Sequence, residues 1–155
     1  MKPKLTIVSG GQTGVDRSAL DWAIERDWPH GGWCPKGRMS EDGVIPEKYM
    51  LKETKASKYL VRTRLNIIHS DGTLILSPLP LTGGTALTAK YAEEEGKAIF
   101  AISPGFEQGD LHALHSFLAT RDSCKLNVAG PRLSQWPDSR DFVKYALSAI
   151  FRFPE

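Results

Sequence analysis

Ser9-Gly10-Gly11-Gln12-Thr13-Gly14 is the stretch of this sequence that decides the fold. It follows a short apolar run over 5–9 and precedes a helical pattern over 15–27, in which apolar residues recur on one face. Glycine adopts positive φ readily and lets the backbone approach a ligand closely. A helix that begins here presents free N–H groups and a partial positive charge to an anion. The stretch therefore predicts a strand, an anion-binding turn and a helix.

The same alternation of strand and helix continues along the chain. Further strands are predicted over 73–77, 98–102 and 125–129, with two short ones near 32–35 and 49–53 in the irregular segment 30–58. Further helices are predicted over 58–70, 85–95 and 111–119, and a last one after an Asp138 cap. Strands that alternate with helices form right-handed β-α-β units. We expect one domain over 1–155, a Rossmann-like three-layer α/β/α sandwich with a mainly parallel sheet of five or six strands.

Composition narrows the functional classes. The 155 residues are 41% hydrophobic and 25% charged, which is typical of a globular chain. A net charge of +2 argues against a nucleic-acid partner. No apolar run approaches the ~20 residues of a membrane helix, and the N-terminus does not resemble a signal peptide. Cys34 and Cys124 lie far apart with no metal-ligand spacing, so we expect reduced thiols in a cytoplasmic protein, with a catalytic Cys34 as the alternative.

A second glycine turn, Leu81-Thr82-Gly83-Gly84-Thr85, also lies between a predicted strand and a predicted helix. The two turns contain five of the fourteen glycines. In open parallel sheets, ligands bind at the carboxyl ends of the strands. Together, the two turns suggest a bipartite cradle for a ligand that carries a phosphate.

Basic side chains supply a counter-charge for this ligand. Segment 36–64 carries a net charge of +4, whereas the rest of the chain carries −2. Tyr59, Arg62 and Asn66 share one helix face, and an arginine can bind phosphate through two parallel hydrogen bonds. Arg62 is therefore the main candidate for the phosphate, and Arg17 is expected at the ligand mouth or in solvent.

Seven motifs follow one another along the chain: Ser9-Gly-Gly-Gln-Thr-Gly-Val-Asp-Arg-x-Ala-Leu-Asp-Trp-Ala23, Gly32-Trp-Cys-Pro-Lys-Gly-Arg38, Glu41-Asp-Gly-x-Ile-Pro46, Tyr59-x-x-Arg-Thr-x-x-Asn66, Ser70-Asp-Gly-Thr-Leu-Ile75, Gly83-Gly-Thr85 and Leu126-Asn-Val-Ala-Gly-Pro-Arg132. In these motifs and their order, the chain resembles the molybdenum cofactor carrier proteins over nearly its whole length. The resemblance implies that the protein binds the molybdenum cofactor (molybdopterin), a pterin with a terminal phosphate and a dithiolene-held metal. It also implies a homo-oligomer, with molybdoenzymes as recipients.

The carriers are similar to a wider superfamily that includes the Lonely Guy phosphoribohydrolases and the lysine-decarboxylase-like proteins. The hydrolase turn reads Pro-Gly-Gly-x-Gly-Thr-x-x-Glu, and Thr88 occupies the position of its catalytic Glu, while Arg62 matches its Arg. A hydroxyl cannot replace a carboxylate as an acid or base near neutral pH. The comparison favours a binding protein. Asp16 or Asp71 could still supply an acid, so a nucleotide-processing N-glycosidic hydrolase and a nucleotide or ADP-ribose sensor remain as alternatives.

We assign no catalytic residue and no metal ligand from the sequence. Trp33 is considered for stacking on a pterin ring, and Asn127 and Arg132 are additional candidates at the end of a predicted strand. The predicted ligand-binding residues are Gly10, Gly11, Gln12, Thr13, Gly14, Arg17, Lys36, Arg38, Arg62, Asn66, Thr82, Gly83, Gly84 and Thr85.

Overall fold

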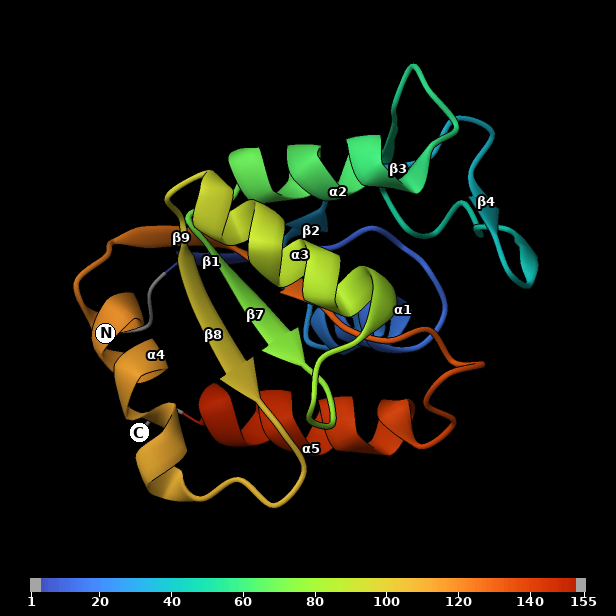
Figure 1. Cartoon of the computed structure of the whole chain (residues 1–155). Coiled ribbons are helices and arrows are strands. Elements are labelled where there is room, and N and C mark those ends of the chain that lie inside the picture. The colour runs from blue at the N-terminus through green and yellow to red at the C-terminus, as the bar shows by residue number, and fades with distance from the viewer. Residues whose placement is uncertain (1–3, 153–155) are drawn as a thin grey trace.

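A five-stranded parallel sheet forms the centre of the protein in the computed structural model, which describes residues 4–152 (Figure 1). Its strands lie in the order β2-β1-β9-β7-β8. Their bounds are β1 (Lys4–Val8), β2 (His30–Gly31), β7 (Gly72–Leu76), β8 (Ala98–Ile102) and β9 (Ser123–Ala129). Every residue of β7 is buried, as is typical of a parallel strand covered on both faces.

Helices cover both faces of this sheet. They are α1 (Val15–Glu25), α2 (Tyr59–Ile68), α3 (Gly83–Glu94), α4 (His112–Ala119) and α5 (Ser139–Ile150), with a 3₁₀ turn η1 (Gln108–Leu111) before α4. The apolar faces of α1, α4 and α5 share one core with the sheet, whereas α2 and α3 pack together on the opposite face (Figure 1). This arrangement confirms the expected Rossmann-like three-layer fold. Among the described residues, no helix is long and apolar enough to cross a membrane.

The last strand of the chain lies in the middle of the sheet. In chain order, the five strands are arranged 2-1-5-3-4. If β9 and α5 preceded β1, the order would become 3-2-1-4-5, which is the doubly wound Rossmann order. β9 pairs with β1 on one side and with β7 on the other. The segment after β9 therefore lies beside the turn that follows β1.

Short strands account for most differences from the predicted elements. β2 was not predicted, and β3 (Trp33–Cys34) and β6 (Lys52–Glu53) pair with each other outside the main sheet. β4 (Met39–Ser40) and β5 (Gly43–Val44) form a small antiparallel hairpin. Two-residue strands contain no periodicity, so the sequence pattern does not indicate their partners.

Segment 30–57 is nevertheless anchored. Cys34, Ile45 and Tyr49 form a second buried cluster with Leu20 of α1.

α3 begins at Gly83, two residues before its predicted start, so Gly83 and Gly84 both lie in the first turn of the helix.

Candidate functional site

A cavity of about 250 Å³ lies at the carboxyl edge of the sheet. Gln12 and Asp16 come to it from the first glycine turn and α1, and Arg62 comes from α2. Gly84 and the segment 129–135 after β9 complete its walls. The cavity thus lies between elements that are far apart in the chain, where the central strands end.

The charged pair inside this cavity consists of Arg62 and Asp16. The Nη1 atom of Arg62 donates to Oδ2 of Asp16 at 3.1 Å, and the backbone N–H of Gln12 donates to the same oxygen at 3.3 Å. The two side chains are 16% and 5% exposed, respectively. Burial raises the pKa of Asp16 and outweighs the opposing influence of Arg62 and of the hydrogen bonds. Asp16 therefore takes up a proton more readily than an ordinary aspartate.

Two buried polar atoms at the cavity have no partner among residues 4–152. They are the Nε of Arg62, a donor, and the Oε1 of Gln12, an acceptor. The amide nitrogen of Gln12 is already engaged, because it donates to the Met39 carbonyl at 3.0 Å. An unsatisfied buried polar group costs about 1–3 kcal/mol. A ligand that has both an acceptor and a donor would satisfy the two atoms together.

The start of α3 faces the same cavity. Thr82 is its N-cap residue and makes no side-chain hydrogen bond to the helix. Gly83 and Gly84 are exposed, and a Cβ at either would meet nothing within 4 Å. The first backbone N–H groups of a helix lack partners within the helix and carry partial positive charge. Gly84 and Thr85 line the cavity, so this terminus is placed to bind an anion beside Arg62.

The first glycine turn packs mainly against protein atoms. A Cβ at Gly10 would lie 1.9 Å from Nη1 of Arg62, so the guanidinium would have to shift if residue 10 had a side chain. Gly11 and Gly14 have positive φ, and a Cβ at Gly14 would lie 2.5 Å from the Pro131 carbonyl oxygen. The turn thus positions Arg62 and Gln12 at the cavity, while Gly11 and Gly14 contact other segments.

Thr13 and Arg17 hold the β4–β5 hairpin. The hydroxyl groups of Thr13 and Ser134 both donate to the carboxylate of Glu41. Arg17 forms an ion pair with Asp42 at 2.5 Å and donates to the Gly11 carbonyl at 3.1 Å. These hydrogen bonds lower the pKa values of Glu41 and Asp42. Neither Thr13 nor Arg17 lines the cavity.

The other predicted basic residues also lie away from the cavity. The guanidinium of Arg38 donates to the carbonyls of Pro46 and Tyr49 at 2.8 and 2.9 Å, so it organises segment 38–51. Lys36 is exposed and does not line the cavity. Asn66 binds both backbone polar groups of Trp33, at 2.8 and 3.0 Å. With Gly10 it lines a separate small space, which shares Asp16 and Arg62 with the cavity.

Several lining residues were not predicted from the sequence. Leu60, Thr63 and Leu87 contribute one wall from α2 and α3. Ala129, Gly130, Pro131 and Gln135, from the segment after β9, form another wall together with Arg132, which the sequence had named as an additional candidate. In the sequence, the only indication that this segment binds a ligand is that it follows a predicted strand. The indication becomes specific once β9 is known to be a central strand, because ligands bind at the carboxyl ends of the strands near the switch in strand order.

The residues considered for catalysis lie in different environments. The Thr88 hydroxyl donates to the Gly84 carbonyl at 3.0 Å within α3, and among the described lining residues Asp16 supplies the only carboxylate. Asp71 lies at the opposite edge of the sheet, where it accepts the backbone N–H of Lys125 at 2.8 Å. Cys34 is fully buried, and desolvation raises its pKa, which disfavours a reactive thiolate. Within residues 4–152, no three His, Cys, Asp or Glu side chains cluster to hold a metal ion.

Comparisons with known proteins agree with this architecture. Residues 7–151 match the model of the circularly permutated YpsA SLOG family. A solved structure from Syntrophus aciditrophicus SB, described as a "putative molybdenum carrier protein", is similar to this chain with a TM-score of 0.90 and 40% sequence identity. The similarity covers 97% of this chain and 98% of that one. No curated protein matches the chain.

Proposed function

Because the chain belongs to the circularly permutated YpsA SLOG family, we propose that it binds and carries the molybdenum cofactor, with the cofactor's phosphate held in the cavity between α2 and α3. The observation that carries the proposal is the convergence of Arg62 and the uncapped start of α3 on one cavity. Both features favour a phosphate, one through a guanidinium and the other through backbone N–H groups. The description of the similar S. aciditrophicus protein supports the choice of cofactor.

The cavity is small for a complete cofactor. Ligand cavities usually measure about 300–1,000 Å³, whereas this one is about 250 Å³. The phosphate end would therefore enter it, and the pterin would extend along the exposed side chains of Tyr59, Leu60 and Leu87 at its rim. A ligand hydroxyl or amine would satisfy Gln12 Oε1. The metal would remain on the dithiolene of the pterin.

The central test is the affinity of purified protein for molybdopterin, measured by calorimetry under anaerobic conditions. Arg62→Ala should weaken binding by the ~1.5–3 kcal/mol typical of hydrogen bonds to charged groups. Arg62→Lys should recover only part of this loss, because an ammonium lacks the planar fork. Arg64→Ala is the matched control, since Arg64 lies two residues further on α2 and binds Glu94 and Glu95 instead.

Circular dichroism should first establish that each variant is folded, because Arg62→Ala leaves Asp16 buried without its cationic partner. If folded Arg62→Ala binds molybdopterin with wild-type affinity, Arg62 does not contribute to ligand binding. An equal loss in Arg64→Ala would show that the effect is not specific to the cavity.

Asp16 supports a second candidate function. A buried carboxyl group with a raised pKa, next to an arginine that could hold phosphate, suits a general acid in N-glycosidic hydrolysis of a nucleotide. The carrier proposal expects no free base when the protein is incubated with a panel of nucleoside monophosphates. If the wild-type protein releases free base and neither Asp16→Asn nor Arg62→Ala does, the protein is an enzyme and the carrier proposal is wrong.

The proposal includes a cytoplasmic homo-oligomer that delivers the cofactor to molybdoenzymes. Apolar side chains of α2 outside the cavity support the oligomer, since Val61 and Ile68 are 36% and 42% exposed. Light scattering of the purified protein tests this part, and a monomeric mass at all concentrations would contradict it.

A further inference from the structure

The central sheet has an open edge at β8 (Figure 1). Within residues 4–152, β8 pairs with β7 on one side and with no strand on the other. Its sequence, Ala-Ile-Phe-Ala-Ile over 98–102, contains neither a charge nor a proline. An unpaired edge is a template for another strand, and proteins usually protect it by a charge, a proline, a bulge or a short length. β2, the other edge strand, has only two residues, whereas β8 has five and lacks such protection.

The outward-facing backbone groups of this edge belong to Ile99 and Ala101. The N–H of Ser77 donates to the Ile102 carbonyl at 3.3 Å, so Ile102 bonds toward β7. Alternate residues of a parallel strand direct both N–H and C=O to the same neighbour, so Phe100 also bonds to β7, while Ile99 and Ala101 point outward. Both are exposed, and no hydrogen bond within the described part of the chain reaches their backbone groups. The edge therefore offers two donors and two acceptors to a partner.

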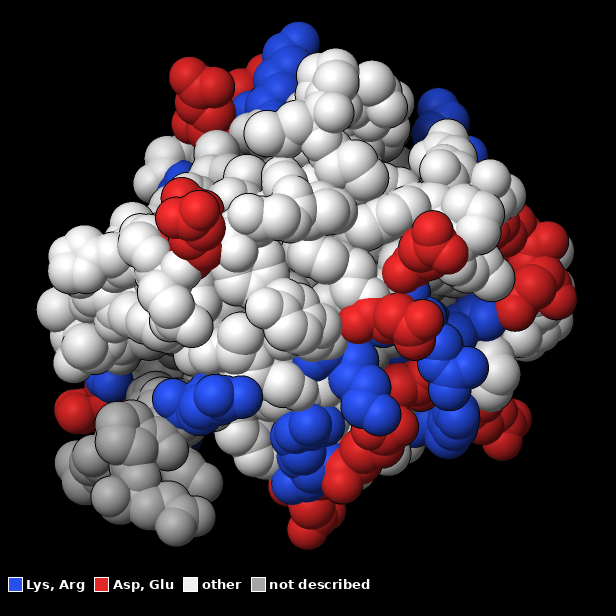
Figure 2. All heavy atoms as spheres, turned by 90° about the horizontal axis from the view of Figure 1, so that it is seen from below, with Lys and Arg blue, Asp and Glu red and all other residues white. Residues whose placement is uncertain are grey.

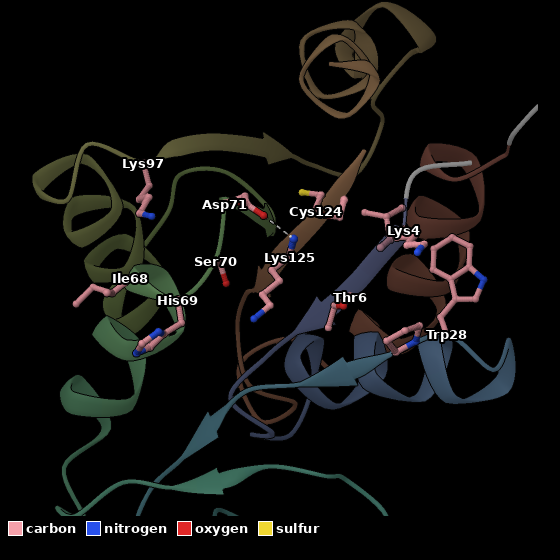
Figure 3. Close-up of a pocket in the computed structure, with 13 residues that line it drawn as sticks. Lys4, Thr6, Trp28, Ile68, His69, Ser70, Asp71, Lys97, Cys124 and Lys125 are labelled. Atoms are coloured by element: carbon pink, nitrogen blue, oxygen red, sulfur yellow. Dashed lines mark hydrogen bonds between the residues drawn. The ribbon is translucent and has the colours of Figure 1, made fainter. Parts of the chain in front are cut away.

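Lys97 directly precedes β8 and is the nearest charge that could protect this edge. Its side chain instead lines a hollow of about 750 Å³ at the amino end of the sheet, together with Lys125 and Asp71. Figure 3 shows the amino group of Lys97 turned toward this hollow. The outer side of β8 is thus left without a charge of its own.

We propose that β8 is the interface between two copies of this chain: the two strands pair in antiparallel fashion about a twofold axis, and the two sheets become one. An axis beside Phe100 places Ile99 of each copy opposite the partner's Ala101, and each such pair exchanges two hydrogen bonds. All outward groups of the edge are then satisfied by the partner's identical groups. The proposal rests on the homo-oligomer of the proposed function and is independent of the cofactor.

The side chains of the paired strands also fit this arrangement. On the face that α3 covers, a large side chain, Ile99, lies opposite a small one, the partner's Ala101. On the other face, Phe100 is half-buried against Phe117, with ring centroids 5.2 Å apart. At the axis it occupies a position without direct hydrogen bonds, where opposite side chains come closest. The partner's Phe100 would cover the exposed part of the ring, and aromatic pairs across strands stabilise a sheet.

Helix α3 adds a second layer to the interface, since it packs on β7 and β8. Tyr91 turns toward α2, where the Arg64 guanidinium lies 4.0 Å from its ring centroid. By the helical period, Ala86 and Ala89 lie on the opposite side of α3, and both are half-buried. A twofold axis brings residues close to their own copies, so like charges there would repel each other. The two alanines and the five residues of β8 are uncharged, and small side chains let two α3 helices approach each other.

The test is sedimentation velocity of the full-length protein over a range of concentrations. Ala101→Pro removes one outward N–H and keeps the β7–β8 ladder, because proline is tolerated on an edge strand where its nitrogen faces solvent. Ile99→Lys places a charge on each side of the pair. We expect each variant to reduce the mass of the oligomer at least by half and to weaken pairing by about tenfold or more. Val44→Lys, at an exposed apolar residue of β5, is the matched control and should leave the mass unchanged.

Hydrogen exchange, followed by NMR for each amide, separates strand pairing from association through another surface. The amides of Ile99 and Ala101 should be protected in the wild-type oligomer, and the Ala101 amide should lose its protection in Ile99→Lys. The amides of Phe100 and Ile102 should stay protected in both proteins, because they bond to β7. Their protection also shows that the variant is folded, and circular dichroism establishes the same for Ala101→Pro.

Two results would overturn the β8 interface and leave the oligomer standing: an unchanged mass in folded Ile99→Lys, or fast exchange of Ile99 and Ala101 in the wild-type oligomer. An equal loss in Val44→Lys would show that the effect is not specific to this edge. A wild-type monomer at all concentrations would overturn both the interface and the oligomer. Arg62→Ala should form the same oligomer as the wild type, so a failure of the cofactor site is recognised separately by calorimetry.

Discussion

Gly10 leaves space for Arg62 and Asp16 in the positions where they meet. A Cβ there would overlap the Arg62 guanidinium and would lie 2.9 Å from Oδ2 of Asp16. The first glycine turn therefore contributes space for a charged pair. A glycine-rich turn before a helix is usually taken to contribute only backbone N–H groups that bind an anion. The pair leaves Arg62 Nε and the partial charge of the α3 terminus available to an anion.

Ligand binding should be coupled to protonation of Asp16. A phosphate beside Arg62 also lies near the Asp16 carboxylate, and the two negative charges repel each other. Since the pKa of Asp16 is already raised, the protonated form is populated at a higher pH than for an ordinary aspartate. Affinity should therefore rise as pH falls through that pKa, by at most about tenfold per pH unit for one proton.

Calorimetry in buffers of different ionisation enthalpy measures this proton uptake. Asp16→Asn is the matched variant, because it keeps a hydrogen-bond acceptor for Arg62 and cannot titrate. The phosphate's own protonation affects both proteins equally, so the difference between them reports Asp16. Equal proton uptake by the two proteins would show that Asp16 does not sense the ligand.

At the scale of elements, the β4–β5 hairpin closes over the first glycine turn. Glu41 reaches Thr13 and Ser134, and Asp42 reaches Arg17, so the hairpin connects the turn after β1 to the segment after β9. Both segments border the cavity. The hairpin thus reinforces a contact between two cavity walls that also meet directly, where the Leu133 N–H donates to the Thr13 hydroxyl and the Val15 N–H donates to the Pro131 carbonyl, each at 3.2 Å.

Acid should release this hairpin. The folded-state pKa values of Glu41 and Asp42 are lowered, so their contribution is complete above the ordinary carboxyl pKa near ~4 and is lost as pH falls through the folded values. Amide chemical shifts of residues 39–44, followed from about pH 7 to about pH 3, should change before global unfolding.

Glu41→Gln should reproduce the loosened hairpin at neutral pH. Because Glu41 is exposed, we expect a change in the free energy of unfolding below about 1 kcal/mol. Shifts in 39–44 that coincide with the unfolding transition would mean that the hairpin has no independent stability.

At the scale of the whole molecule, the arrangement of the strands indicates that the two chain ends could be joined and new ends opened elsewhere. The start of β1 and the end of α5 lie on the same side of the molecule (Figure 1). The turn between α4 and β9 is exposed at Thr120 and Asp122. Since β9 and α5 occupy the place of a first β-α unit, a chain with joined ends that begins at Arg121 would have the 3-2-1-4-5 strand order.

Such a permuted variant, joined by a flexible Gly/Ser linker, should fold to the same structure. It keeps every strand pair and exchanges one loop for another, and loop-closure entropy varies slowly with length. Circular dichroism and a single cooperative thermal transition would verify the fold, and the Arg62-dependent ligand affinity should persist. An aggregated or molten product would show that the natural order of synthesis is needed.

The surface of the whole molecule carries both positive and negative side chains. On the face shown in Figure 2, basic and acidic side chains lie next to one another along one side, and much of the remaining surface is uncharged. The described residues of that face thus form no continuous basic patch of the kind that binds a nucleic-acid backbone. Arg62 and Arg132 instead place positive charge inside the cavity between α2 and α3.

The sequence by itself determined the Rossmann-like class, four of the five sheet strands and the two glycine turns, because hydrophobic periodicity and turn chemistry are local properties. Only the tertiary structure decided which predicted residues share a cavity. It brought Gln12, Arg62, Gly84 and Thr85 together and directed Arg17 and Arg38 to loop contacts. It also placed β9 in the middle of the sheet and left Lys125 uncovered. Strand order and side-chain partners depend on contacts between residues far apart in the chain, and no local pattern specifies them.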